Sequence, residues 1–171
     1  MKKWIKGLVA AVIILGIGWY FERRPSPLDL PEEIRLILSA PDSVKASRTL
    51  GFMADSAADS PKALQAFYEK ETNSVVVPRG AAERVAAIIT LEDRKSATRS
   101  KCIYRPGFVM TFIRSGEKSI DIFFCFECGG MVMKISGQTD PQDLGMMTTY
   151  QAELLAIFKK LFPEDPKIRA L

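Results

Sequence analysis

The sequence predicts an α+β domain preceded by a transmembrane helix, on the basis of three observations. Residues 7–21 form an uncharged apolar run with basic residues on both sides. Residues 102–136 contain three segments of interleaved apolar residues separated by turn signals, which is typical of a three-stranded antiparallel meander. Helical periodicity before and after this meander, as in residues 81–91, predicts helices that pack on the sheet. The predicted parts are a membrane anchor or signal peptide (1–24), a proline-rich linker (25–30) and a single α+β domain (31–171).

The amino-terminal run is short for a membrane span, which needs about 20 apolar residues and at least about 17. Including Trp4 and Ile5, with Lys6 reaching toward the head groups, brings the run to this lower limit. The residues expected to anchor the helix at the two membrane surfaces are Trp4, Lys6, Trp19, Tyr20, Arg23 and Arg24. The alternative is a signal peptide cleaved near residues 16–18, which would release a secreted protein.

The distribution of charge also indicates a lipid partner. The chain of 171 residues has 24 basic and 20 acidic side chains, and the whole excess of +4 lies within residues 1–24. More basic residues precede the apolar run than follow it, which favours a single-pass protein of a bacterial inner membrane with its domain in the periplasm. Because the rest of the chain is neutral, we expect the lipid bilayer as a partner, a possible protein partner and no nucleic acid.

The elements before the meander follow from periodicity and from proline and glycine signals. In order, we expect a helix at 31–38, a strand at 43–50, a helix at 60–68, a strand at 75–77, a helix at 81–91 and a polar loop at 92–101. The strand at 43–50 alternates between apolar and polar residues, and Arg48 is the exception on its apolar side. Such alternation predicts a strand with one buried face.

The meander is expected to pair around a turn whose central residues are Gly116 and Glu117. That turn would place Cys125 opposite Phe108 and Cys128 opposite Arg105. A polar loop at 137–145 and a final helix, capped by the threonines at 148 and 149 and ended by the proline at 163, complete the domain.

The three cysteines, Cys102, Cys125 and Cys128, are disulfide candidates, because the domain is expected outside the cytoplasm. A bend at residues 105–107 would bring Cys102 to Cys128, leaving Cys125 buried in the sheet, and a Cys125–Cys128 bridge is the alternative. A structural zinc site almost always has a fourth cysteine or histidine ligand, and the chain contains no histidine. We therefore predict no metal site and no cofactor.

The segment that contains these cysteines resembles a known type of motif. Cys102-Ile-Tyr-Arg-Pro-Gly-Phe, the turn at 116–118 and the Cys-Phe-Glu-Cys sequence at 125–128 are similar to a hairpin in small uncharacterised bacterial membrane-anchored or secreted proteins. Those relatives often carry histidine after the proline, where this chain has Gly107 and Phe108. The resemblance implies a bacterial envelope protein and no particular activity.

The sequence offers no catalytic residues. Without histidine, the usual general base and the usual nucleophile pairs are missing, and no glycine-rich phosphate loop is present. Asp121 and Glu127 would lie on one strand face about 20 Å apart, too far for a glycosidase pair, and are expected as a hydrogen-bonded sheet residue and a solvated strand end. The expected function is therefore a non-enzymatic, membrane-tethered extracytoplasmic domain for binding or assembly. The alternative is a thiol redox or metal-binding protein that uses the three cysteines.

Overall fold

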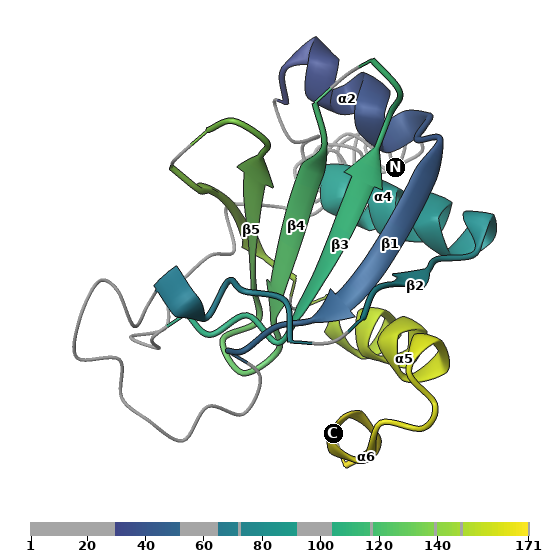
Figure 1. Ribbon diagram of the computed structural model, residues 1–171, viewed down its shortest axis with the longest axis vertical. Helices are drawn as coiled ribbons and strands as arrows, with labels where there is room; N and C mark the ends of the chain where they lie inside the picture. The colour runs from purple at the N-terminus through teal and green to yellow at the C-terminus, as the bar shows by residue number, and fades with distance from the viewer. Residues whose placement is uncertain are drawn as a thin grey trace, which may run out of the picture.

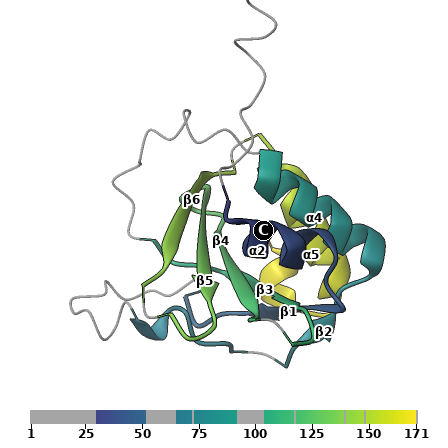
Figure 2. The same ribbon diagram turned by 90° about the horizontal axis from the view of Figure 1, so that it is seen from above.

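The protein, for which we use a computed structural model, has a mixed architecture in the part that the structure describes. The described residues are 30–51, 65–71, 73–91, 104–116, 118–138, 140–147 and 149–170. They form a six-stranded sheet with helices packed against one of its faces (Figures 1 and 2). The α+β class expected for the domain therefore describes this arrangement.

The sheet is antiparallel throughout, with the order β2-β1-β3-β4-β5-β6. Its strands are β1 (Ser43–Arg48), β2 (Val75–Val76), β3 (Phe108–Ile113), β4 (Ile120–Cys125), β5 (Gly130–Ile135) and β6 (Gln142–Met146). The predicted meander forms β3, β4 and β5 at the centre of the sheet (Figure 1). The sheet extends beyond the meander on both sides, through β1 and β2 on one side and β6 on the other.

The helices cover one face of the sheet, as Figure 2 shows from above. They are α2 (Glu32–Ser39), α4 (Arg79–Leu91), α5 (Gln151–Leu161) and α6 (Pro166–Arg169). Each of the three longer helices buries one apolar stripe and exposes the remainder, which is the pattern of a helix that covers a sheet.

The core between the helices and the sheet is centred on aromatic rings. Phe108 on β3 and Phe124 on β4 are cross-strand partners, and both are fully buried. The ring of Phe158, from α5, stacks on Phe108 at 4.3 Å and meets Phe124 edge-on at 5.3 Å between ring centroids. Such pairs contribute about 0.5–1.5 kcal/mol each beyond the burial of their area, so α5 is firmly held on the sheet.

The predicted fold was wrong in its first element, the transmembrane helix. Among the described residues, no helix has both the length and the apolar character that a membrane crossing requires. The helices there are short and one-sided, and α4, with 13 residues, buries one face while its other residues meet solvent. The apolar run at 7–21, on which the prediction rested, lies outside the described residues.

Two predictions within the sheet also need correction. The hairpin between β3 and β4 pairs Phe108 with Phe124, one position away from the predicted pairing of Phe108 with Cys125. The reason is the turn, in which Gly116 alone is central and adopts a positive φ of 78°. Residues 137–145 were expected as a loop, yet β6 begins at Gln142 because its backbone pairs with β5, although only Leu144 gives an apolar signal.

Candidate functional site

The face of the sheet opposite the helices carries a row of polar side chains. Lys45, Thr111, Asp121 and Lys134 are successive cross-strand partners on β1, β3, β4 and β5. Their neighbours along each strand point toward the helices, because side chains alternate between the two faces. We term this side of the sheet the open face and these four residues the polar row. The row places two cations at its ends and one carboxylate between them.

The carboxylate of Asp121 is fixed by two neighbours. The hydroxyl group of Thr111 donates a hydrogen bond to Oδ1 of Asp121 at 2.5 Å. The ammonium group of Lys70 donates to the same hydroxyl oxygen at 3.0 Å and lies 3.5 Å from Oδ1 of Asp121. Lys70 belongs to a segment that crosses the open face, residues 65–71, which we term the crossing segment. Both contacts involve the same carboxylate oxygen, so among the described contacts Oδ2 is left to accept hydrogen bonds from a ligand.

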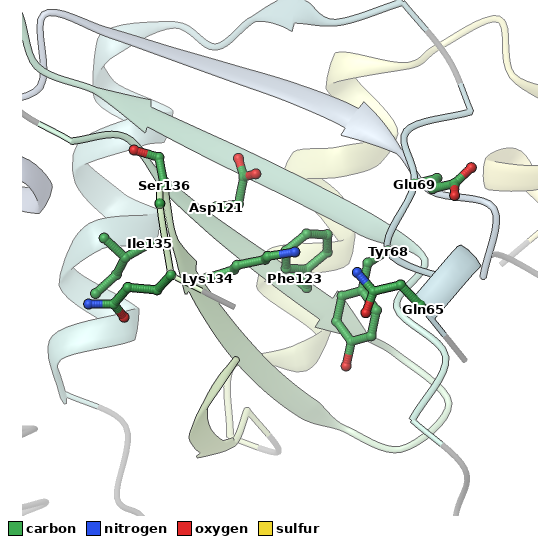
Figure 3. Close-up of a pocket in the computed structure, with 10 residues that line it drawn as sticks. Gln65, Tyr68, Glu69, Asp121, Phe123, Lys134, Ile135 and Ser136 are labelled. Atoms are coloured by element: carbon green, nitrogen blue, oxygen red, sulfur yellow. The ribbon is translucent and has the colours of Figure 1, made fainter. Parts of the chain in front are cut away.

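Lys134, unlike Lys70, does not contact the carboxylate of Asp121. Among the described residues its ammonium group forms neither a hydrogen bond nor an ion pair, even with Asp121, its cross-strand partner. Figure 3 shows its side chain extending from β5 along the sheet toward Phe123. The side chain is partly buried at the surface of the sheet, and within the described ranges its ammonium group keeps its donors for a ligand.

A hollow of about 230 Å³ lies over this part of the open face, between the crossing segment and strands β4 and β5 (Figure 3). Its walls therefore come from segments that are far apart in the sequence. The residues that line it are Gln65, Tyr68, Glu69, Asp121, Phe123, Lys134, Ile135, Ser136, Gly137 and Gln138.

Aromatic rings form the floor and one side of the hollow. Phe123 is 2% exposed, and the ring of Tyr68 meets it edge-on with 4.9 Å between centroids. Tyr104 stacks on Tyr68 at 6.2 Å, and its hydroxyl group donates a hydrogen bond of 2.7 Å to the carbonyl oxygen of Phe123. Burial raises the pKa of both tyrosines, that of Tyr104 well above its ordinary value of 10.0. Both phenols therefore remain protonated donors at neutral pH.

Backbone hydrogen bonds hold the crossing segment in place. The N–H group of Leu50 donates to the carbonyl oxygen of Glu69 at 2.9 Å, and that of Gly51 donates to Phe67 at 3.2 Å. A Cβ atom at position 51 would lie 2.6 Å from the carbonyl oxygen of Pro106, so only glycine fits at this position. Gly51 thus permits the close approach of its own backbone to Pro106 and to Phe67 of the crossing segment.

The cysteines lie away from the hollow or outside the described residues. Cys125 is a buried free thiol, and burial raises its pKa despite a hydrogen bond from the backbone of Cys128, which acts in the opposite direction. The alternative Cys125–Cys128 bridge is therefore wrong for this structure. Cys128 is not a free thiol. Cys102 lies outside the described residues, so the Cys102–Cys128 bridge stays a prediction.

No metal centre is found in the part of the chain that the structure describes, where no three histidine, cysteine, aspartate or glutamate side chains are grouped to hold an ion. Glu127 lies exposed in the turn between β4 and β5, whereas Asp121 lies in the sheet. The other predicted site residues fall outside the described residues, namely Trp4, Lys6, Trp19, Tyr20, Arg23 and Arg24.

The comparisons with known proteins add nothing to this geometry. No family model, curated protein or solved structure matches the chain. Of the residues around the hollow, the sequence singled out Asp121, and the expectation that it is hydrogen-bonded within the sheet is confirmed. It did not identify Tyr68, Lys70 or Lys134. Asp121 and Lys134 are each the single charged residue of an otherwise apolar strand, and this could have been noticed in the sequence. Only the correct strand register, however, shows that the two residues are cross-strand partners.

Proposed function

We propose that the protein is a non-enzymatic binding domain whose binding surface is the open face of the sheet. The observation that carries this proposal is the convergence, in one hollow, of an aromatic floor, the ammonium group of Lys134 and the available oxygen of Asp121. A concave site with an apolar surface and a few convergent polar groups is the usual form of a ligand site. The described helices pack on the other face of the sheet (Figure 2), and a ligand reaches this face through the hollow beside the crossing segment.

Binding accounts for these residues better than catalysis does. Thr111 and Lys70 fix Asp121 as a hydrogen-bond acceptor, which suits recognition of a ligand group. The chain contains no histidine to serve as a general base. The buried thiol of Cys125 has a raised pKa, whereas a nucleophilic cysteine needs a lowered one.

The same thiol argues against a redox function for the cysteines. Redox-active cysteines are thiolates at accessible positions, and Cys125 is neither exposed nor easily ionised. With a Cys102–Cys128 bridge, non-reduced protein should react with maleimide at one thiol in denaturant and at none when folded. Three thiols that react in the folded protein would instead favour the redox or metal-binding alternative.

We also propose that the full chain associates with a lipid bilayer through residues 1–24, with its domain in the periplasm; the proposal concerns this association and not a transmembrane helix, which the described residues do not contain. The support is the sequence alone, in its apolar run and flanking basic residues. Carbonate washing of membranes from cells that express the chain tests this attachment. We expect the wild-type chain to stay with the membranes and the Ile13→Asp variant to be released, because a charge within the run is costly in lipid. Release of the wild-type chain would contradict the attachment.

A melting screen tests the binding function without a known ligand. The full chain is heated with sugars, amino acids, nucleosides and small carboxylic acids, and so are the variants Lys134→Met and Lys45→Met. Lys45 is the matched control, because it lies in the same polar row but does not line the hollow. A ligand at 100 times its Kd stabilises a protein by about 2.7 kcal/mol, which raises the Tm of a domain of this size by about 5–10 °C.

We expect at least one compound class to raise the Tm of the wild-type chain and of Lys45→Met, but not that of Lys134→Met. A compound that stabilises all three proteins equally binds elsewhere and contradicts the proposed surface. The absence of any stabilising compound across the four classes would also count against it.

A further inference from the structure

We propose that the ligand of the hollow is a neutral saccharide, of which the hollow holds one sugar ring. This inference rests on the proposed function and assigns a ligand class to it. Four properties of the lining lead to it, namely its balance of charge, its mixture of hydrogen-bond donors and acceptors, the apolar surface of Tyr68, and its size.

The charges around the hollow nearly cancel. Lys134 contributes a cation to the lining, and Glu69 and Asp121 contribute carboxylates. Lys70, 3.5 Å from Asp121, offsets one of these negative charges. A site for an organic anion or cation would carry an excess of the opposite charge, because electrostatic complementarity selects the partner. The balanced lining therefore favours an uncharged ligand.

The polar groups of the lining suit hydroxyl groups. Gln65 and Gln138 each present an amide with both a donor and an acceptor, and Ser136 presents a hydroxyl group. Lys134 can only donate, and the carboxylate of Asp121 only accepts. A hydroxyl group both donates and accepts, so a ligand with several hydroxyl groups on one ring can satisfy this alternating set. A purely apolar ligand would leave these groups desolvated and unpaired, which is unfavourable.

Tyr68 supplies the apolar surface that a sugar ring also needs. It is partly buried, packs on Phe123 with the two rings at 79° to each other, and lines the hollow (Figure 3). An aromatic ring of this kind offers an apolar body to the C–H groups of a sugar and a hydroxyl group to its polar edge. The sugar therefore meets apolar and polar surface on adjacent sides.

The size of the hollow limits the ligand to one ring at a time. Its volume of about 230 Å³ lies below the range of about 300–1,000 Å³ for sites that enclose drug-sized ligands. The hollow lies on a sheet face and opens to solvent, so the rest of an oligosaccharide extends over the neighbouring surface.

Calorimetric titration of the full chain tests this inference, in a detergent whose head group is not a sugar. The probes are the neutral disaccharides maltose, cellobiose and N,N′-diacetylchitobiose, together with charged glucosamine and glucuronate. We expect at least one neutral disaccharide to bind more tightly than both charged sugars. Lys134→Met should weaken that binding at least about tenfold, because it removes a charged donor. Gln65→Ala, a change at an exposed position, should weaken it about threefold, and Lys45→Met should leave it unchanged within about twofold.

The outcomes separate this inference from the proposed function. Tighter binding of glucuronate or glucosamine that is lost in Lys134→Met overturns the neutral saccharide but leaves the open face as the binding surface. If none of the five sugars binds while a compound of another class stabilises the chain in the melting screen, the neutral saccharide is likewise overturned and the open face remains the proposed binding surface. Sugar binding that persists in both Lys134→Met and Gln65→Ala places the sugar elsewhere and overturns the inference and the proposed surface together.

Discussion

An ion-pair cluster that joins β1 to the carboxyl-terminal helix offers a quantitative test of the fold. On the helix-facing side of β1, Nη1 of Arg48 lies 2.7 Å from Oδ2 of Asp165, and Nε lies 2.7 Å from Oε2 of Glu71. The side chains of Arg48 and Asp165 are only 12% and 14% exposed. The Arg48→Met variant keeps an apolar side chain in this position but leaves the carboxylate of Asp165 without its cation.

The expected loss of stability is large because the carboxylate of Asp165, left without its cation, is poorly solvated. Removal of one partner from a buried ion pair costs about 3–5 kcal/mol. Since the pair retains some contact with water, we take the lower end and expect a loss of about 3 kcal/mol for Arg48→Met. For a denaturant slope of about 2 kcal/mol per molar urea, the unfolding midpoint should fall by about 1.5 M.

A double-variant cycle in urea isolates the interaction. Asp165→Asn removes the charge but retains the side-chain oxygen that accepts a hydrogen bond from the backbone N–H of Ile168 at 3.2 Å. We expect Arg48→Met to cost less when Asp165→Asn is present, with a coupling of about 1–2 kcal/mol. The matched control is Arg79→Met, which removes an arginine that is 93% exposed and lies 2.8 Å from Glu83. Its effect should be much smaller, because exposed ion pairs contribute little.

Two results would refute this reasoning. If Arg48→Met and Arg79→Met destabilise the protein equally, the burial of the Arg48 cluster does not matter. If the losses from Arg48→Met and Asp165→Asn simply add, the two side chains do not interact in solution, and α6 is not held as described.

Three further predictions concern other parts of the fold. Gly51→Ala should destabilise the protein by about 2 kcal/mol in urea unfolding, because its Cβ atom would collide with the carbonyl oxygen of Pro106, and an unchanged midpoint would mean that the contact is looser. Burial raises the pKa of Tyr104 well above its usual 10.0, so the stability it contributes is complete below that pH and is lost as pH rises toward the folded value. Tyr104→Phe should flatten the fall in stability between pH 9 and 11, and an equally steep fall would contradict the assignment. Arg84 donates to Glu153 at 2.6 and 2.8 Å and lowers the pKa of that carboxyl below 4.5. Glu153→Gln should therefore destabilise the protein at pH 7, and the effect should shrink as the pH falls below 4.5 and the carboxylate of the wild-type chain is protonated; an effect of constant size from pH 7 to acid pH would exclude this cause.

The parts of the fold that sequence predicted are those in which local pattern and burial agree. The alternation at 43–50 predicted β1, and the exception within it, Arg48, indeed lies on the helix-facing side, where carboxylates from distant segments pair with it. The apolar stripes of α4 and α5 were likewise visible, because each helix buries one face on the sheet.

The sequence failed where pairing, not side-chain pattern, determines the structure. β6 is an edge strand with polar residues. It is a strand because its backbone forms hydrogen bonds with β5, and its side chains show no strand pattern. The one-residue error in the β3–β4 register arose at Gly116, since turn length is not encoded in the strands themselves. The candidate site was missed for a related reason. Lys70 and Tyr68 reach the sheet through backbone bonds of the crossing segment, and no local pattern marks such contacts.

The central claim is that ligands bind on the open face, and amide chemical shifts test it most directly. The isotope-labelled full chain would be titrated with the three neutral disaccharides, and each backbone N–H signal followed. We predict that the shifted signals belong to the crossing segment, to β4 around Asp121 and Phe123, and to residues 134–138. Shifts confined to α2 and α4, on the opposite side of the sheet, would contradict the account.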